Sequence, residues 1–280
     1  MELTEPKVYL VARPSIVLDE GLLEYLGSIG ADNWSDKRFG TESGATTDAE
    51  KLVEIGGRLC YRSFEPGLNP NVTRVREDPA VYFENILRSG HGSVLEHAYF
   101  SFICHNVSLV FTHEMVRHRA GWGFSQESLR FVRLSDIRFR VPEALTHDVD
   151  TGEPLKYQGS EGVELVEDLI SRHVEEAEQL QQALSEVHGL DDESNFHRKK
   201  EVTSAMRRVA PNGLSTTILM TGNIRAIRQV IEMRTAGGAE EEIRTVIDQV
   251  GRIMRKECPL LFRDYERSDE GEWTTPYRKV

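Results

Sequence analysis

The chain has 280 residues, of which 39% are hydrophobic and 29% are charged, and its formal net charge at pH 7 is −12. This composition is typical of a globular protein that is long enough to build a substantial core. The acidic balance argues against a general nucleic-acid binder, for which a basic surface is expected. Any phosphate ligand must therefore be held by local groups of arginines, not by the overall field of the protein.

The sequence also predicts where the protein works. The N-terminal residues Met-Glu-Leu-Thr-Glu-Pro lack the basic start and apolar run of a signal peptide, and no apolar stretch is long enough to span a membrane. The three cysteines, Cys60, Cys104 and Cys258, are odd in number and scattered, which fits a reducing compartment. None lies in a basic loop that would lower the pKa of its thiol. We therefore expect a cytoplasmic protein with three core thiols.

Hydrophobic periodicity and capping residues predict the elements of the first half of the chain. Thr47 and Asp78 are helix caps, and Asp78 is followed by a proline suited to the first helical turn. Ser108 caps a further helix, and alternation predicts a half-buried strand before it. In chain order, we expect a strand at 7–12, a loop at 27–44, helices at 47–60 and 79–88, a strand at 98–104 and a helix from 108 to about 119.

In the second half, an apolar stripe with glutamates on the opposite face predicts a long amphipathic helix. The acidic loop at 148–161 is the one candidate for a domain boundary. We expect helices at 161–187, 195–208, 223–234 and 239–256, with a short strand at 216–220. Residues 1–280 are thus predicted to form a single domain in which strands and helices are mixed.

The stretch from Arg117 to Phe131 is unusually rich in polar side chains around two glycines. Because glycine costs about 1 kcal/mol inside a helix, the helix should end near Arg119, a loop should follow, and a strand should start near Leu129. Arginine forks beside free backbone N–H groups suit phosphates and nucleobases. A solvated basic loop is the alternative. The donors are Arg117, His118, Arg119 and Arg130, and the acceptors are Ser125, Gln126, Glu127 and Ser128.

This stretch resembles the Arg-His-Arg-x-x-Ser-x-x-x-x-Ser-x-Arg signature of flavin-dependent thymidylate synthases. The signature places are taken by Arg117, His118, Arg119, Ser128 and Arg130. Trp122 stands where the first signature serine would be, and the spacing to Ser128 is one residue longer. A serine nucleophile has no histidine–carboxylate pair to activate it here. Ser128 is therefore expected to bind substrate phosphate or ribose.

A second segment, residues 90–97, resembles the Gly-His-x-Ser/Thr-x-x-Glu-His element of the same family. The resemblance places His91 near the flavin ring, and Ser93 and Glu96 on cofactor phosphate or sugar. A metal site made by His91, His97 and His105 is an alternative, but no established ligand spacing is completed. A strand-entry loop with incidental histidines is a further alternative.

Glu114 lies in a near miss to a zinc motif. In His113-Glu114-Met115-Val116-Arg117-His118 the two histidines are five residues apart, hence about 140° around a helix, so they cannot share a metal. The resemblance instead puts Glu114 on the substrate side, where a base or ribose contact is expected.

The third segment runs from Arg207 to Glu242 and resembles the second half of the family pattern, Arg-x-x-x-Pro, a threonine run and Asn-x-Arg. The resemblance assigns Asn223, Arg225 and Gln229 to the flavin, and Arg207 and Arg234 to the nucleotide, with Arg234 facing the pyrimidine carbonyl. Gly238 stands where relatives often carry a histidine. A surface salt bridge is the alternative for any single arginine.

The resemblance implies an α/β fold with a central sheet against long helices, and a homotetramer with sites at subunit interfaces. It implies reductive C5-methylation of a uridine monophosphate, dUMP or UMP, with FAD, NADPH and methylenetetrahydrofolate. Catalysis falls to Arg234 and His91. The flavin is expected at His91, Ser93, Glu96, Arg117, His118, Arg119, Ser125, Gln126, Asn223, Arg225 and Gln229, and the nucleotide at Glu114, Glu127, Ser128, Arg130, Arg207 and Arg234, with no metal.

Three questions stay open at this point. The altered loop around Trp122 leads to the hypothesis that UMP is accepted as well as dUMP. A metal-dependent nucleotide hydrolase using His91, His97 and His118 is one alternative function. A non-catalytic nucleotide-binding protein is another.

Overall fold

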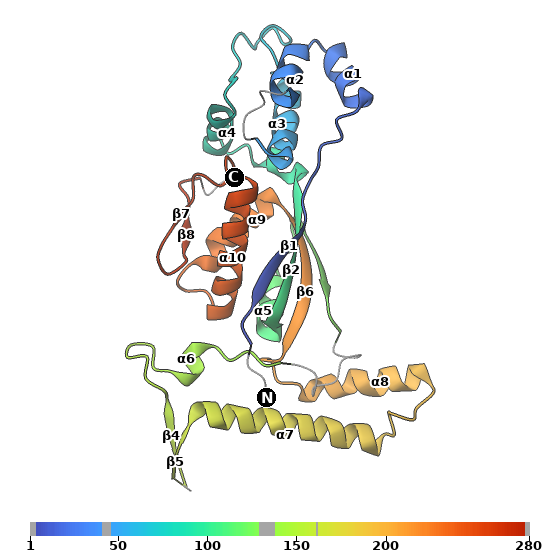
Figure 1. Cartoon of the computed structure of the whole chain (residues 1–280), viewed down its shortest axis with the longest axis vertical. Helices are drawn as coiled ribbons and strands as arrows, with labels where there is room; N and C mark the ends of the chain where they lie inside the picture. Colours follow the sequence, from blue (N-terminus) through green and yellow to red (C-terminus); the bar gives the residue numbers. More distant parts are fainter. Residues whose placement is uncertain (1–3, 41–45, 129–137, 161, 278–280) are drawn as a thin grey trace.

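A four-stranded antiparallel sheet lies at the centre of the computed structural model, which describes residues 4–40, 46–128, 138–160 and 162–277 (Figure 1). The strand order is β1-β2-β6-β3, and every neighbouring pair is antiparallel. The strands are β1 (Lys7–Ala12), β2 (Tyr99–Ser108), β6 (Ser215–Asn223) and β3 (Trp122–Gln126). The expected strand at 7–12 is confirmed, and β2 and β6 are longer than predicted.

One face of the sheet is covered by α9 (Ile224–Thr235) and α10 (Glu241–Glu257), with α5 (Leu109–Met115) beside them. Alternate residues of β2, including Phe100 and Phe102, are fully buried against these helices. The inward face of α10 repeats at helical spacing through Ile243, Ile247 and Met254, each 0% exposed. A packed apolar stripe of this kind accounts for most of the stability of a helix in water.

The opposite face of the sheet is largely open in the described part of the chain. Its large side chains include Tyr9, Tyr99 and Leu219, which are 43%, 47% and 37% exposed. Tyr9 pairs with Ile103, and Ile103 pairs with Leu219, so three of these strands contribute to one apolar row. Contiguous apolar surface of this kind marks an interaction face.

The N-terminal helices form a smaller unit above the sheet (Figure 1). They are α1 (Glu20–Ser28), α2 (Asp32–Phe39), α3 (Asp48–Tyr61) and α4 (Pro79–Arg88). Thr47 caps α3 in a capping box with Glu50, and Asp78 caps α4, as predicted. The expected loop at 27–44 is wrong over 27–28, where α1 ends, and over 32–39, where α2 forms. Trp34 and Arg38 anchor α2 because both donate to the buried Glu54.

An arm extends from the other end of the sheet (Figure 1). It comprises the hairpin β4 (Lys156–Gly159) and β5 (Gly162–Leu165), then α7 (Val166–Val187) and α8 (Phe196–Met206). The helix predicted from 161 begins only at Val166, because residues 162–165 pair with β4. Along α7 only Val174 and Ala177 are buried.

Short elements complete the fold: η1 (Gly92–His97), α6 (Glu143–Thr146), η3 (Arg207–Val209), β7 (Glu266–Arg267) and β8 (Trp273–Thr274). None of the helices that the structure describes is both long enough and apolar enough to cross a membrane.

Candidate active site

The arginine-rich stretch begins at the end of α5. The Ser108 side chain caps this helix by accepting from the backbone N–H of Phe111 at 3.2 Å, as predicted. The helix ends at Met115, however, and not near Arg119, because the N–H groups of Arg117 and His118 close short turns onto Glu114 and Met115. These turns place Arg117, His118 and Arg119 in a connection between α5 and the sheet.

The loop predicted after Arg119 is wrong over 122–126, where the chain forms β3. Trp122 pairs with Gly222 and Phe124 with Met220, and both rings pack against the core. The Trp122 ring lies over Gly222, where an added Cβ would come within 2.7 Å of it. The missing side chain at Gly222 is therefore what makes room for the strand. The strand start expected at Leu129, and Arg130 with it, lie outside the described residues.

Arg234, at the end of α9, is held by two residues of the α5 segment. Its Nε donates to Nε2 of His118 at 2.8 Å, and its Nη1 donates to the Glu114 carboxylate at 2.9 Å. The side chains of Arg234 and Glu114 are 21% and 30% exposed. Burial, together with the charges of Arg234 and Arg117, lowers the pKa of His118. A neutral imidazole and a carboxylate thus orient one cation that still reaches solvent.

Asn223 joins the start of β3 to the start of α9. Its backbone N–H donates to the carbonyl of Gly121 at 3.1 Å, and its side chain caps α9 by accepting from the N–H of Ala226 at 2.9 Å. Gly121 has a φ of +76°, and a Cβ there would lie 2.6 Å from the Asn223 amide nitrogen. Glycine is thus required twice, by the backbone conformation and by the close approach.

The His91 segment lies against the same end of α9. Arg225, in the first turn of α9, donates to Glu96 at 2.6 Å, and both side chains are nearly half exposed. The His91 ring stacks on Tyr61 of α3, with ring centroids 6.2 Å apart. Ser93 is exposed in η1. Residues from three distant parts of the sequence therefore meet where a helix N-terminus favours an anion.

A model of the thymidylate synthase complementing protein family matches residues 44–260. The chain belongs to this family.

The relatives support the assignment. The chain is 32% identical over 224 residues to the flavin-dependent thymidylate synthase of Corynebacterium diphtheriae, covering 80% of this chain and 82% of that one. It is 34% identical over 224 residues to the enzyme of the same name from Mycobacterium avium, covering 79% and 82%. A crystal structure of the UMP/dUMP methylase PolB from Streptomyces cacaoi, bound with 5-Br UMP, has the same fold at a TM-score of 0.58 and 19% identity, covering 94% of both chains. The prediction of a flavin-dependent methyltransferase with a mixed α/β fold is confirmed.

Other family positions do not join this cluster within one chain. Arg207 lies in η3, before the nine-residue β6, and Asn223 ends that strand. A nine-residue strand separates its two ends by about 30 Å. The chain leads away from Gly121 through Ser125, Gln126 and Glu127. Ser125 pairs with Leu219 on the open face of the sheet. Predicted positions that are described but remain at the surface are Arg117, Arg119, Gln126, Glu127 and Gln229, with Ser128 half-buried.

Two positions of the site were missed from the sequence. Tyr61 was placed beyond the end of a predicted helix, and nothing in its spacing relates it to His91. Gly121 was read only as a helix breaker. Its position directly before the aromatic pair Trp122 and Phe124, whose rings stack nearly parallel at 6.0 Å, is the signal of a strand entry.

The histidines do not assemble a metal site. Across the part of the chain that the structure describes, no three His, Cys, Asp or Glu residues are grouped so as to hold a metal ion. His97 packs on Gly56, where a Cβ would come within 2.7 Å of its ring. His105 bonds to Thr217 at 3.0 Å, and His118 is engaged by Arg234. Within the described residues, no cluster of ligands therefore supports the hydrolase alternative.

Proposed function

We propose that this protein methylates C5 of a uridine monophosphate, using bound FAD, methylenetetrahydrofolate as carbon donor and NADPH as reductant. The observation that carries the proposal is the Arg234 guanidinium, oriented by Glu114 and His118 and still exposed to a ligand. The names of the relatives and of the structural neighbour, which is called a UMP/dUMP methylase, support the same reaction class.

The residues at the start of α9 fit a flavin dinucleotide. Arg225 offers an exposed guanidinium beside the capped helix N-terminus, and Arg117 and Arg119 are exposed on the adjoining turn. These groups suit a diphosphate. His91 and Tyr61 present two nearly parallel rings, 29° apart, beside which a planar ring system can lie. We assign Ser93, Glu96, Asn223, Arg225 and Gln229, with the arginine turn and His91, to this cofactor.

When bound, the flavin supplies the reducing electrons, and the protein's residues supply position and charge. Activating C5 of uracil as a carbon nucleophile spreads negative charge onto the ring carbonyls before C5 attacks the carbon donor. Arg234 stabilises this charge as it develops, because its orientation is fixed beforehand. Glu114 and His118 fix that orientation. His91 is assigned to orienting the cofactors and assisting proton transfer.

This mechanism needs no enzyme nucleophile. Burial raises the pKa of Cys104 to about 12 and that of Cys258 well above its ordinary value, so neither thiol ionises near neutrality. Cys60 is exposed near the end of α3, so the expectation of a core thiol is wrong for this residue.

We infer that UMP is accepted as well as dUMP. Gly237 and Gly238 come after Ala236, the residue that follows the α9 segment ending with Arg234 and Thr235, and a Cβ added at either glycine would meet nothing within 4 Å. The chain beside Arg234 is therefore unobstructed, which leaves room for a ribose 2′-hydroxyl. The remaining nucleotide contacts are assigned to Glu127, Ser128, Arg130 and Arg207.

We further propose that the working enzyme is a homotetramer with sites between subunits, in which residues 1–280 act as one domain. The open apolar face of the sheet and the largely uncovered α7 give a second copy two surfaces to bury. An interface would also bring Arg207 of one subunit to the Arg234 cluster of another. We place the enzyme in the cytoplasm because all three cysteines are free.

The function is tested by purifying the protein and recording its absorbance. We expect a yellow protein that oxidises NADPH and, in single turnover with methylenetetrahydrofolate, methylates both UMP and dUMP. A colourless protein that takes up no FAD contradicts the reaction. Methylation of dUMP alone contradicts only the inference about UMP. Binding of nucleotide and flavin without any turnover would favour the non-catalytic alternative.

A further inference from the structure

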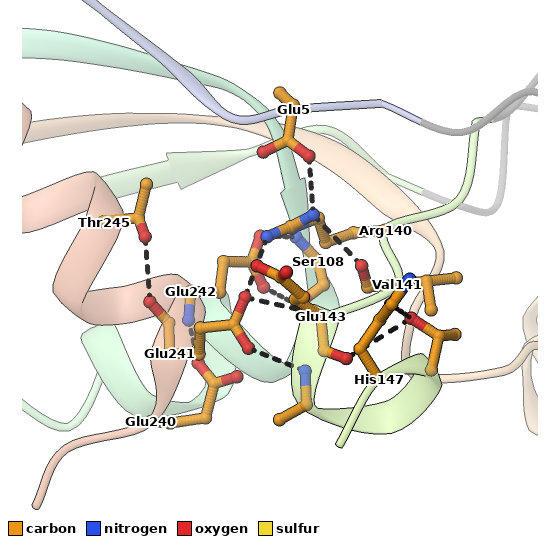
Figure 2. Close-up of polar contacts among 12 residues, drawn as sticks. Glu5, Ser108, Arg140, Val141, Glu143, His147, Glu240, Glu241, Glu242 and Thr245 are labelled. Atoms are coloured by element: carbon orange, nitrogen blue, oxygen red, sulfur yellow. Dashed lines mark hydrogen bonds and ion pairs between the residues drawn. The ribbon is translucent and has the colours of Figure 1, made fainter. Parts of the chain in front are cut away.

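Three consecutive glutamates, Glu240, Glu241 and Glu242, open α10, and each has a different set of partners (Figure 2). Glu240 caps its own helix by accepting from two backbone N–H groups of the first turn, at 2.8 and 3.1 Å. Glu241 accepts from two N–H groups at the start of α6, at 3.1 and 3.3 Å. Glu242 turns inward and is 1% exposed.

Glu242 holds one residue with both carboxylate oxygens. The backbone N–H of Ser108 donates to Oε1 at 2.8 Å, and the Ser108 hydroxyl donates to Oε2 in a short hydrogen bond (Figure 2). The same hydroxyl accepts from Phe111 as the cap of α5. Because the Ser108 hydroxyl donates its hydrogen to Glu242, the lone pairs of its oxygen face the backbone N–H groups of α5. The first turn of α5 is thus positioned by α10.

The last turn of α5 is fixed at the reaction site. The helix has seven residues, so it is only about 10 Å long. Glu114 lies in its last turn and His118 just after it, and both bind Arg234. Residues 236–240 lead from α9 to Glu242. Glu242 therefore contacts the start of α5, the end of α5 contacts Arg234, and a short segment of chain connects Arg234 back to Glu242.

We propose that Glu242 is a positioning residue: through Ser108 it holds α5 so that Glu114 and His118 meet Arg234 in one orientation. Its effect on turnover rests on the proposed function, whereas its effect on the Arg234–His118 contact does not.

The free-energy cost of burying Glu242 supports a role in orienting α5. Burial raises the pKa of Glu242, and the hydrogen bonds from Ser108 only partly oppose this. The charged groups that face it are Glu240 on its own helix and Arg140 from the segment before α6. Burying a carboxylate costs free energy, whereas apolar side chains would join the two helices at lower cost. What the carboxylate provides, and an apolar contact would not, is a fixed orientation of Ser108 and of the start of α5.

The experiment compares Glu242→Gln with Glu241→Gln in the full-length enzyme. Glutamine keeps the volume but has one acceptor oxygen, so it cannot accept from both groups of Ser108. For Glu242→Gln we expect kcat to fall about tenfold with little change in KM, since small misplacements of catalytic groups are costly. The control keeps kcat within about twofold, because Glu241 contacts α6 and Arg140 and not α5.

A second readout does not depend on activity. In Glu242→Gln the NMR titration of His118 should move toward an ordinary histidine pKa, because Arg234 is no longer held against it; in Glu241→Gln it should not move. A purely structural role for Glu242 would lower the unfolding temperature without this change.

Two results would overturn the inference. One is a folded Glu242→Gln enzyme whose kcat and His118 titration both match the wild type. The other is an equal loss of kcat in both glutamine variants, which would indicate general destabilisation. If the wild-type protein itself fails to methylate any uridylate, the proposed function is wrong, and the His118 titration still decides whether Glu242 positions α5.

Discussion

The guanidinium of Arg234 donates to Nε2 of His118 at 2.8 Å, across 116 positions of sequence. The donor requires a lone pair on Nε2, so the imidazole is neutral and carries its proton on Nδ1. Burial and two neighbouring guanidinium charges lower the pKa of His118, which favours the same form. With Glu114 as the second acceptor, the plane of the cation is set before any substrate binds. Preorganised charge of this kind is a major source of rate acceleration.

Arg234→Ala should abolish nucleotide-dependent turnover while leaving the flavin bound. Removing one preorganised donor typically lowers kcat by about 10²- to 10³-fold, and the residues assigned to the flavin lie at the other end of α9. Turnover and the flavin absorbance spectrum measure the two effects separately. Loss of the flavin instead would mean that the two sets of arginines have been exchanged.

Arg234→Lys is the matched control for charge. Lysine keeps the positive charge but has no fork that can contact both His118 and Glu114. We expect activity between those of the wild type and Arg234→Ala. Activity equal to that of the wild type would show that charge alone is sufficient and that the orientation is not needed.

His118 predicts the acid limb of the pH profile. Once protonated, His118 can no longer accept from Arg234, so kcat/KM should fall as the pH decreases. Because the pKa of His118 is lowered, the midpoint should lie below 6.5, the ordinary histidine value. His118→Gln keeps an acceptor oxygen that does not titrate, and the limb should disappear in this variant. If the acid limb persists in His118→Gln, it is caused by the titration of another group.

The lowered pKa of His118 also predicts how the free energy of unfolding changes with pH. The folded-state pKa of His118 is depressed relative to the unfolded chain, so the unfolded state binds more protons below about pH 6.5. Its contribution is therefore present above pH 6.5 and is lost as the pH falls through the folded-state value. The difference in unfolding free energy between wild type and His118→Gln should shrink over that window, as measured by denaturant titration.

Much of the helical fold could be predicted because its caps are visible in the sequence. Thr47, Asp78 and Asn223 each accept backbone N–H groups at the helix starts where they were expected. The helix at Asp32 was missed because its N-cap, Ala31, makes no side-chain cap. The strand β3 was missed because its fit depends on Gly222, which lies about 100 residues further along the chain.

The sequence predicts a set of candidate site residues, but it does not predict their arrangement. Motif spacing placed His91, Asn223 and Arg225 in one group, and η1 and α9 do lie together. The pairing of Arg234 with His118 and Glu114 could not be derived, because no local pattern encodes a contact between two helix ends. Arg207, which precedes β6, is separated within one chain from Asn223 by the length of that strand, about 30 Å.

Gly121→Ala should destabilise the fold by about 1–3 kcal/mol, the usual cost of a strained backbone position. The φ of Gly121 is +76°, and the added Cβ would clash with Asn223 and Ala226. The matched control is Gly123→Ala, two residues away, where a Cβ meets nothing within 4 Å. Denaturant unfolding should separate the two variants clearly. Equal stabilities would mean that the close contact between Gly121 and Asn223 does not form.

Arg225→Gln should weaken FAD binding with little loss of stability. The Arg225–Glu96 ion pair is 44% and 47% exposed, and pairs this exposed contribute about 0–1 kcal/mol. Its guanidinium is instead assigned to the cofactor phosphates, where charge-assisted bonds are stronger. We expect the dissociation constant for FAD to rise about tenfold, measured by flavin fluorescence.

The control for this prediction is Arg172→Gln on the α7 arm, which breaks an exposed ion pair with Glu164 whose two hydrogen bonds are 3.1 and 3.2 Å long. Both variants should have nearly the same unfolding temperature, because each loses one solvent-screened pair. Only Arg225→Gln should release the flavin. If the two variants retain FAD equally well, Arg225 forms a surface ion pair and nothing more, and the start of α9 is not the phosphate site.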